Sequence, residues 1–225
     1  MLTLILMEIM NFNLSNTNGT AVTRLKPWTI NKVVLKSVEL KTGTSSEGRE
    51  WKAMQFNFEG PDGIYEHKVF CPGEKGDERM TGITNGREWE LPSAMEQLQF
   101  NIAHVCTVLA PDAFEKLKGV ELDLPKDFEK LVKAVQQVLA KSLNVETNIK
   151  LIGNSEGYAT VPNFVNINKT TKEAYISNNW LGENLGFSAY ETQQMNKAKN
   201  STPTPVIETE DVDTSSDDDD IDLGL

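Results

Sequence analysis

Basic and aromatic side chains gather on two stretches of the chain that alternate like strands. Proteins that bind single-stranded nucleic acid need positive charge along the phosphates and aromatic rings on which bases stack. The stretches around Trp51 and Tyr65 offer both, and residues elsewhere could extend the same groove. The candidate DNA-binding residues are Lys26, Trp28, Arg49, Trp51, Lys52, Tyr65, His67, Lys68, Lys150 and Tyr158. The alternative is that the rings cap the core and the lysines are only solvated.

The acidic end of the chain, SSDDDDIDLGL, could bind a partner protein. Nine of the 33 acidic residues follow Asn200 with no basic residue among them, which leaves residues 1–199 with 24 acidic and 22 basic side chains. Such a tail cannot bury enough apolar surface to order itself, so we expect residues 200–225 to be disordered. It either keeps the protein soluble or is bound by another protein. The candidate partner-binding residues are Asp217, Asp218, Asp219, Asp220, Ile221, Asp222, Leu223 and Leu225.

Evidence for a metal site or for catalysis is weak. His67, Cys71, His104 and Cys106 are zinc ligands by type, but the last two would point about 200° apart on a predicted helix. The chain has no P-loop spacing, no HExxH and no GxSxG motif. We therefore predict no metal, no cofactor and no enzymatic activity. A nucleic-acid enzyme with carboxylate-bound metal stays as an alternative. Two cysteines in 225 residues favour a reducing compartment.

The elements that must position these residues follow from hydrophobic periodicity. Alternation in 51–58 places Met54, Phe56 and Phe58 on one face and Trp51 on the other, so that Trp51 points away from the core. A capping box at Ser188 and Glu191 predicts the start of a last helix. The predicted order is strands at 30–40, 51–58 and 64–70, helices within about 93–143, strands at 147–152 and 158–167, and a helix at 188–199. The last strand is expected to be interrupted at Pro162.

This order predicts a mainly β fold with a helical insert. Specifically, we expect a five-stranded OB-like barrel with two helices between the third and fourth strands. A two-layer α+β sandwich is the competing architecture. We expect a loose segment at 1–23, one domain at 24–199 and the tail at 200–225. The apolar run at 1–10 is too short to span a membrane and lacks signal-peptide features, so Met7 or Met10 could be the true start.

The ending DDDDIDLGL, the strand–helix–strand order and the Trp51/Tyr65 groove carry a resemblance to a known family. In these three features the chain resembles the single-stranded DNA-binding proteins of bacteriophages and bacteria. The resemblance implies an OB fold, sequence-independent binding in phage DNA replication, recombination or repair, and location in the host cytoplasm. It also implies that the tail recruits replication or recombination proteins.

The chain departs from the bacterial form in two places. The bacterial tail ends in an aromatic residue after a proline, whereas this chain ends in Leu-Gly-Leu, and the large helical insert favours a phage-type variant. The alternative function is a protein-interaction or assembly factor that uses the acidic tail and binds no DNA. The sequence leaves the oligomeric state open.

Overall fold

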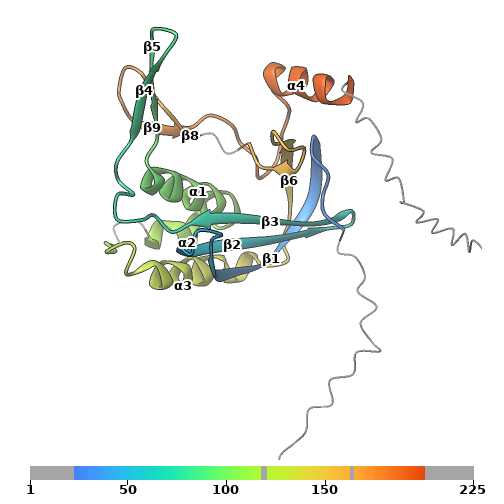
Figure 1. Cartoon of the computed structure of the whole chain (residues 1–225). Coiled ribbons are helices and arrows are strands. Elements are labelled where there is room, and N and C mark those ends of the chain that lie inside the picture. Colours follow the sequence, from blue (N-terminus) through green and yellow to red (C-terminus); the bar gives the residue numbers. More distant parts are fainter. Residues whose placement is uncertain (1–22, 118–120, 163–164, 201–225) are drawn as a thin grey trace, which may run out of the picture.

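The computed structural model describes residues 23–117, 121–162 and 165–200. Its main element is a strongly curled antiparallel sheet of five strands in the order β3-β2-β1-β6-β7 (Figure 1). The strands are β1 (Thr29–Thr44), β2 (Glu50–Gly60), β3 (Gly63–Phe70), β6 (Glu146–Gly153) and β7 (Ala159–Thr160). The sheet forms a half-barrel, and this mostly β architecture is compatible with an OB-like fold.

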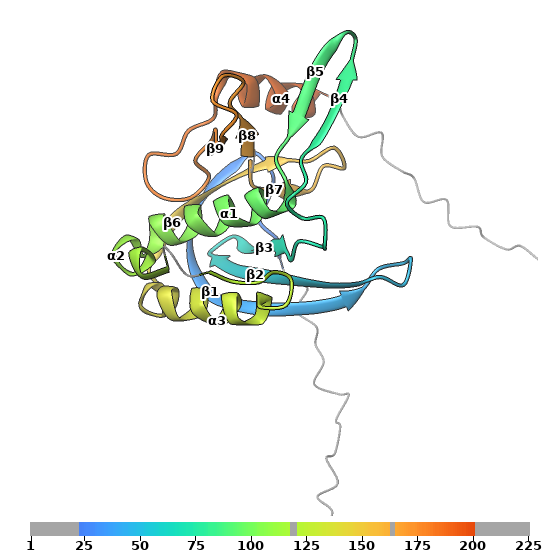
Figure 2. The same cartoon turned by 90° about the vertical axis from the view of Figure 1, so that its left-hand side faces the viewer.

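Helices and two small hairpins surround this sheet. Helices α1 and α3 lie against the same face of it, which we call the helix-side face; the opposite face is the outer face (Figure 2). The helices are α1 (Ala94–Leu109), α2 (Pro111–Phe114), α3 (Phe128–Leu139), α4 (Ala189–Asn200) and the 3-10 helices η2 (Glu115–Leu117) and η3 (Ala140–Ser142). The hairpins are β4 (Met80–Thr84) with β5 (Arg87–Leu91), and β8 (Val165–Ile167) with β9 (Ala174–Ile176).

The core lies between the helix-side face and the two long helices. Met54, Phe56 and Phe58 of β2 are all buried there, so the predicted alternation of this strand is confirmed. The apolar side chains that face them from α1 and α3 are Leu98, Ile102, Val105, Phe128, Val132, Val135 and Leu139. Removal of this apolar surface from water is the main driving force for closing helices onto sheet.

A β-bulge bends β1, so that this one strand pairs with β6 on one side of the curled sheet and with β2 on the other. The register against β2 shifts between Leu35 and Ser37. Val33 and Leu35 are buried before the bulge and Val38 after it, because one extra residue reverses which side chains face the core. A bulge also bends its strand. The first part of β1 therefore pairs with β6 and the later part with β2.

One prediction about element order is wrong. The β4–β5 hairpin follows β3, so the helices do not come directly after the third strand; α1 to α3 instead occupy the region between β5 and β6. The predicted interruption of the last strand at Pro162 is confirmed, because this residue has no N–H to donate to a ladder. The two pieces belong to different sheets: Ala159 and Thr160 pair with β6, whereas Val165–Ile167 pairs with β9.

The predicted last helix is confirmed as α4. Glu191 N donates to Ser188 Oγ at 3.2 Å, and Ser188 N donates to the Glu191 carboxylate at 2.6 Å, which is the reciprocal pattern of a capping box. Only Glu191 is buried within this helix. Helix α4 is therefore held to the rest of the protein through its first turn.

Candidate nucleic-acid interface

An exposed aromatic pair lies on the outer face of β2 and β3. Trp51 and Phe70 meet edge to face, with ring centroids 5.7 Å apart and an interplanar angle of 74°. Phe70 is 56% exposed and Trp51 is half-buried. Because successive side chains of a strand alternate between faces, Lys68 lies on the same face as Phe70. The outer face therefore offers two rings and a cation, the types of group that hold single strands.

A glycine lets Trp51 lie flat across the β1–β2 hairpin. Gly43 is directly opposite Trp51 in the register. A Cβ at position 43 would be 2.5 Å from Trp51 Cζ2, which no real contact allows. One side of the indole therefore rests on the backbone of Gly43, and the ring is held in place before any ligand arrives.

Charges of both signs flank the aromatic pair. Glu39 is paired with Lys41 at 2.5 Å, and this hydrogen bond, with a second from Ser37, lowers the pKa of the Glu39 carboxyl. Glu66 is paired with Arg24 at 3.4 Å. Lys68 is exposed and forms no ion pair with any residue that the structure describes. The acidic groups on this face thus have partners, while Lys68 is available to a phosphate.

A groove of about 700 Å³ runs along the open edge of the half-barrel, between β3 and β7. Lys26, Lys68 and Tyr158 line it, and Tyr158 is 69% exposed. Tyr158 belongs to the turn between β6 and β7, where Asn154 Oδ1 accepts hydrogen bonds from the backbone N–H groups of Glu156 and Tyr158 at 3.0 and 2.8 Å. The groove begins at Lys68 on β3 and so continues the outer face.

Three of the predicted DNA-binding residues face the core or are covered, although two of them, Tyr65 and His67, also border the groove between β3 and β7. His67 is buried, and its Nε2 lies 3.2 Å from Asn101 Oδ1. Burial lowers the pKa of His67 to about 4. Tyr65 is half-buried, and its hydroxyl accepts a hydrogen bond from Val161 N at 3.1 Å across the open edge of the sheet. Lys150 is buried against α4. We therefore remove His67 and Lys150, which are buried, from the candidate interface, and Tyr65 stays as part of the wall of the groove.

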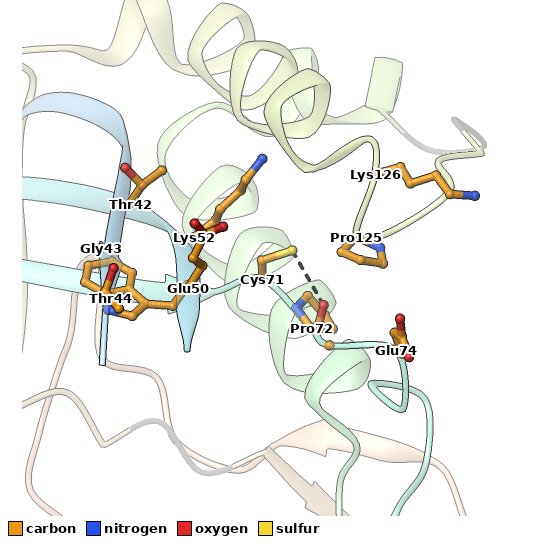
Figure 3. A pocket seen from close by; sticks show the side chains of 12 residues that line it. Thr42, Gly43, Thr44, Glu50, Lys52, Cys71, Pro72, Glu74, Pro125 and Lys126 are labelled. Atoms are coloured by element: carbon orange, nitrogen blue, oxygen red, sulfur yellow. Dashed lines mark hydrogen bonds between the residues drawn. The ribbon is translucent and has the colours of Figure 1, made fainter. Parts of the chain in front are cut away.

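The other predicted residues are scattered around the sheet. Lys52 is on the opposite face of β2 from Trp51, and its Nζ points toward α3 (Figure 3). It pairs there with Glu129 at 2.9 Å. Arg49 is exposed in the turn between β1 and β2 and pairs with Glu47 at 2.9 Å. Trp28 is half-buried and packs on Gly153. Trp28 does not join the aromatic pair, and Arg49 lies in the turn that precedes it. Lys52 borders a hollow of about 660 Å³ that Trp51 lines as well.

Two members of the outer face were not among the predicted residues. Phe70 and Lys41 lie there with Trp51 and Lys68. The signal was present in the stretch IYEHKVF, whose alternation puts Tyr65 and His67 on one face and Lys68 and Phe70 on the other. The predicted DNA-binding residues were chosen by residue type alone, so the prediction placed side chains from both faces of β3 in one groove.

No family model, curated protein or solved structure matches this chain. Within 23–117, 121–162 and 165–200, no group of three or more His, Cys, Asp or Glu side chains is arranged to hold a metal ion. The helices of those same ranges include none with the length and apolar character needed to cross a bilayer. The predicted partner-binding residues of the tail, from Asp217 to Leu225, lie outside the described residues.

Proposed function

We propose that this protein binds single-stranded DNA without sequence preference and has no enzymatic activity. The observation that supports this most directly is the Trp51–Phe70 pair on the outer face of β2 and β3, beside Lys68, which has no ion pair among the described residues. Bases of any sequence can stack on such rings, and the lysine can hold the phosphates.

The arrangement of the sheet supports an OB-type binding mode. OB folds bind oligonucleotides on the face of their second and third strands and with the loops between strands one and two and between strands four and five. In this chain, those loops are the β1–β2 turn with Arg49 and the β6–β7 turn with Tyr158. We propose that the half-barrel is an OB variant whose helical insert fills the inner side of the sheet.

We further propose a place in phage DNA replication, recombination or repair, in the cytoplasm of the host cell. This part rests on the resemblance of the acidic tail to those of known single-stranded DNA-binding proteins. In this proposal, the tail recruits replication or recombination enzymes.

A titration of the full chain with oligo-dT at two salt concentrations tests the proposal. We expect binding at about 50 mM salt that is tighter than binding to duplex DNA and that falls steeply by about 200 mM, because phosphate contacts release counterions. Absence of binding at the lower salt concentration would remove the proposal. That result would favour the alternative function, a protein-interaction or assembly factor that binds no DNA.

Replacing Trp51 by Ala is expected to weaken binding to oligo-dT by about 1–3 kcal/mol, which is the usual contribution of one base–aromatic stack. The change should appear in the dissociation constant measured by fluorescence anisotropy of a labelled oligonucleotide. Tyr190→Ala is the matched control, because this ring is 67% exposed but lies on α4, away from the outer face of β2 and β3. Equal affinity of folded Trp51→Ala and wild type would show that the indole only covers the hairpin.

Deleting residues 209–225 is expected to raise the affinity for single strands, most strongly at low salt. An acidic segment competes with DNA for positive charge, and salt screens that competition. Replacing Asp217, Asp218, Asp219 and Asp220 by Asn should reproduce most of the gain. Replacing Ile221, Leu223 and Leu225 by Ser should spare DNA binding and reduce capture of a replication partner. If neither DNA affinity nor partner binding changes on deletion, the tail serves solubility alone.

A further inference from the structure

The β4–β5 hairpin, Met80 to Leu91, stands off from the body as an arm. It rises above the sheet while the β1–β2 hairpin extends sideways (Figure 2). The register pairs Met80 with Leu91, Gly82 with Trp89, and Thr84 with Arg87. Because side chains alternate, these three pairs share one face of the arm, which we call the Trp89 face.

Charge is divided between the two faces of the arm. The Trp89 face has no acidic residue, and its Arg87 is exposed with no ion pair to the part of the chain that the structure describes. Both acidic residues of the hairpin, Glu88 and Glu90, lie on the opposite face. Glu90 is paired there with Arg79 at 3.0 Å and with Lys172 at 3.2 Å. The Trp89 face is therefore aromatic, apolar and positively charged.

Trp89 is held flat on the arm in the same manner as Trp51 on its hairpin. A Cβ at Gly82 would be 2.3 Å from Trp89 Cζ2, so the indole rests directly on the glycine backbone. Trp89 Nε1 donates a hydrogen bond to Thr84 Oγ1 at 3.1 Å, which fixes the ring within its plane. The side chain is nevertheless 38% exposed. Such a ring loses little conformational freedom when a base stacks on it.

The base of the arm is fixed to the body. The Arg79 guanidinium pairs with Glu96 in the first turn of α1 and with Glu90 of β5. Glu96 also accepts a hydrogen bond from Ser93 N at 2.9 Å, as part of the capping box of α1. The arm therefore presents Trp89 from a defined position. Trp89 also borders a hollow of about 850 Å³. Lys169 and Lys172 line it together with Glu88 and Glu90, and Lys172 is paired with Glu90, so the positive charge of the Trp89 face comes from Arg87 alone.

We propose that the Trp89 face of the arm is a second contact site for single-stranded DNA, in which a base stacks on Trp89 and Arg87 holds a phosphate. This inference rests on the proposed function, and it extends the path of the strand beyond the outer face of β2 and β3. The occupant is a nucleic acid because the face has a pre-positioned ring, no carboxylate of its own, and a guanidinium without an ion pair in the described ranges.

Three variants of the full chain test the inference with oligo-dT of about 24 nucleotides, long enough for several stacking sites. Trp89→Ala should weaken binding about fivefold or more, and Trp89→Phe should recover most of the loss because it restores a ring. Arg87→Gln disturbs no packing. It should reduce the steepness of a plot of log association constant against log salt concentration by about one, because one phosphate contact is lost. Ile83→Ala is the matched control, since Ile83 is 72% exposed on the opposite face of the same arm.

The outcomes separate this inference from the proposed function. If the wild-type protein binds no oligo-dT, the proposed function itself fails. If the wild type binds and Trp51→Ala weakens it, but Trp89→Ala and Arg87→Gln bind like the wild type, the arm makes no contact and the inference is overturned. If Trp89→Ala instead changes the mass in sedimentation without changing DNA affinity, the arm joins copies of the chain, which also overturns the inference.

Discussion

The Lys150→Met variant is expected to lose about 3–5 kcal/mol of unfolding free energy, because it leaves one charge buried without its partner. Lys150 Nζ pairs with the Glu191 carboxylate at 3.2 Å, and both side chains are only 4% exposed. The same Nζ donates a hydrogen bond to Gly186 O at 3.0 Å. Removing Lys150 would leave the buried Glu191 carboxyl without its cationic partner. Urea unfolding measures the loss.

The pair also determines whether α4 stays in place. Glu191 is both the partner of Lys150 and a member of the capping box that starts α4. We therefore expect the amides of α4 to exchange hydrogen faster in Lys150→Met, ahead of those in β6. This local effect distinguishes the loss of the pair from a general loss of packing.

A double variant provides the control. Glu191→Gln in the Lys150→Met background removes the uncompensated charge, and Gln can still accept the capping hydrogen bond. We expect it to recover most of the lost stability, because replacing a buried ion pair as a whole is often neutral. If Lys150→Met alone unfolds at the same urea midpoint as the wild type, Lys150 and Glu191 do not form a buried ion pair.

Lowering the pH from 6.5 to 4.5 is expected to cost about 2–3 kcal/mol of stability through His67. Burial lowers the pKa of His67 from 6.5 to about 4. Between these values, the unfolded chain binds a proton that the folded chain does not, so stability is complete above pH 6.5 and falls as the pH decreases. His104, whose pKa burial also lowers to about 4, adds to the loss in the same direction.

The surroundings of the histidines explain why protonation is unfavourable. Trp180 packs between them, with ring centroids 4.9 Å from His67 and 5.1 Å from His104. Asn101 Nδ2 donates to Gln97 O, which leaves Asn101 Oδ1 to accept from His67. No carboxylate among the described residues pairs with either ring. An imidazolium would therefore be buried without an opposite charge.

Urea unfolding at several pH values, followed by Trp fluorescence, measures the effect. Carboxyl groups that have a lowered pKa, such as Glu39 and Glu96, also begin to lose their contribution to stability as the pH approaches 4.5, where the unfolded chain starts to bind protons on them. The His67→Phe/His104→Phe double variant keeps this carboxyl contribution and lacks that of the histidines. It should therefore show a smaller slope than the wild type between pH 6.5 and 4.5, and the difference measures the histidines. A wild-type stability that stays constant from pH 6.5 to 4.5 would contradict the burial of these rings.

The sequence by itself determined the features that depend on neighbouring residues. Alternation placed Phe56 and Phe58 in the core and Trp51 on the outer face, and the spacing of Ser188 and Glu191 predicted the start of α4. The alternation of apolar residues and the capping box are local features, because each follows from the geometry of one strand or one helical turn. The same alternation, applied to β3, would have separated Lys68 and Phe70 from His67.

Only the tertiary structure decided what covers each face. Lys150 is buried because residues 180–191 pass over β6 and bring Glu191 to it from 41 positions away. His67 is buried because α1 and Trp180 close over the helix-side face. Trp51 and Trp89 lie flat because a glycine is opposite each of them across a hairpin, and this depends on the pairing register. Contacts between residues far apart in sequence leave no periodic signal, so a lysine on a strand looks the same whether water or a helix covers it.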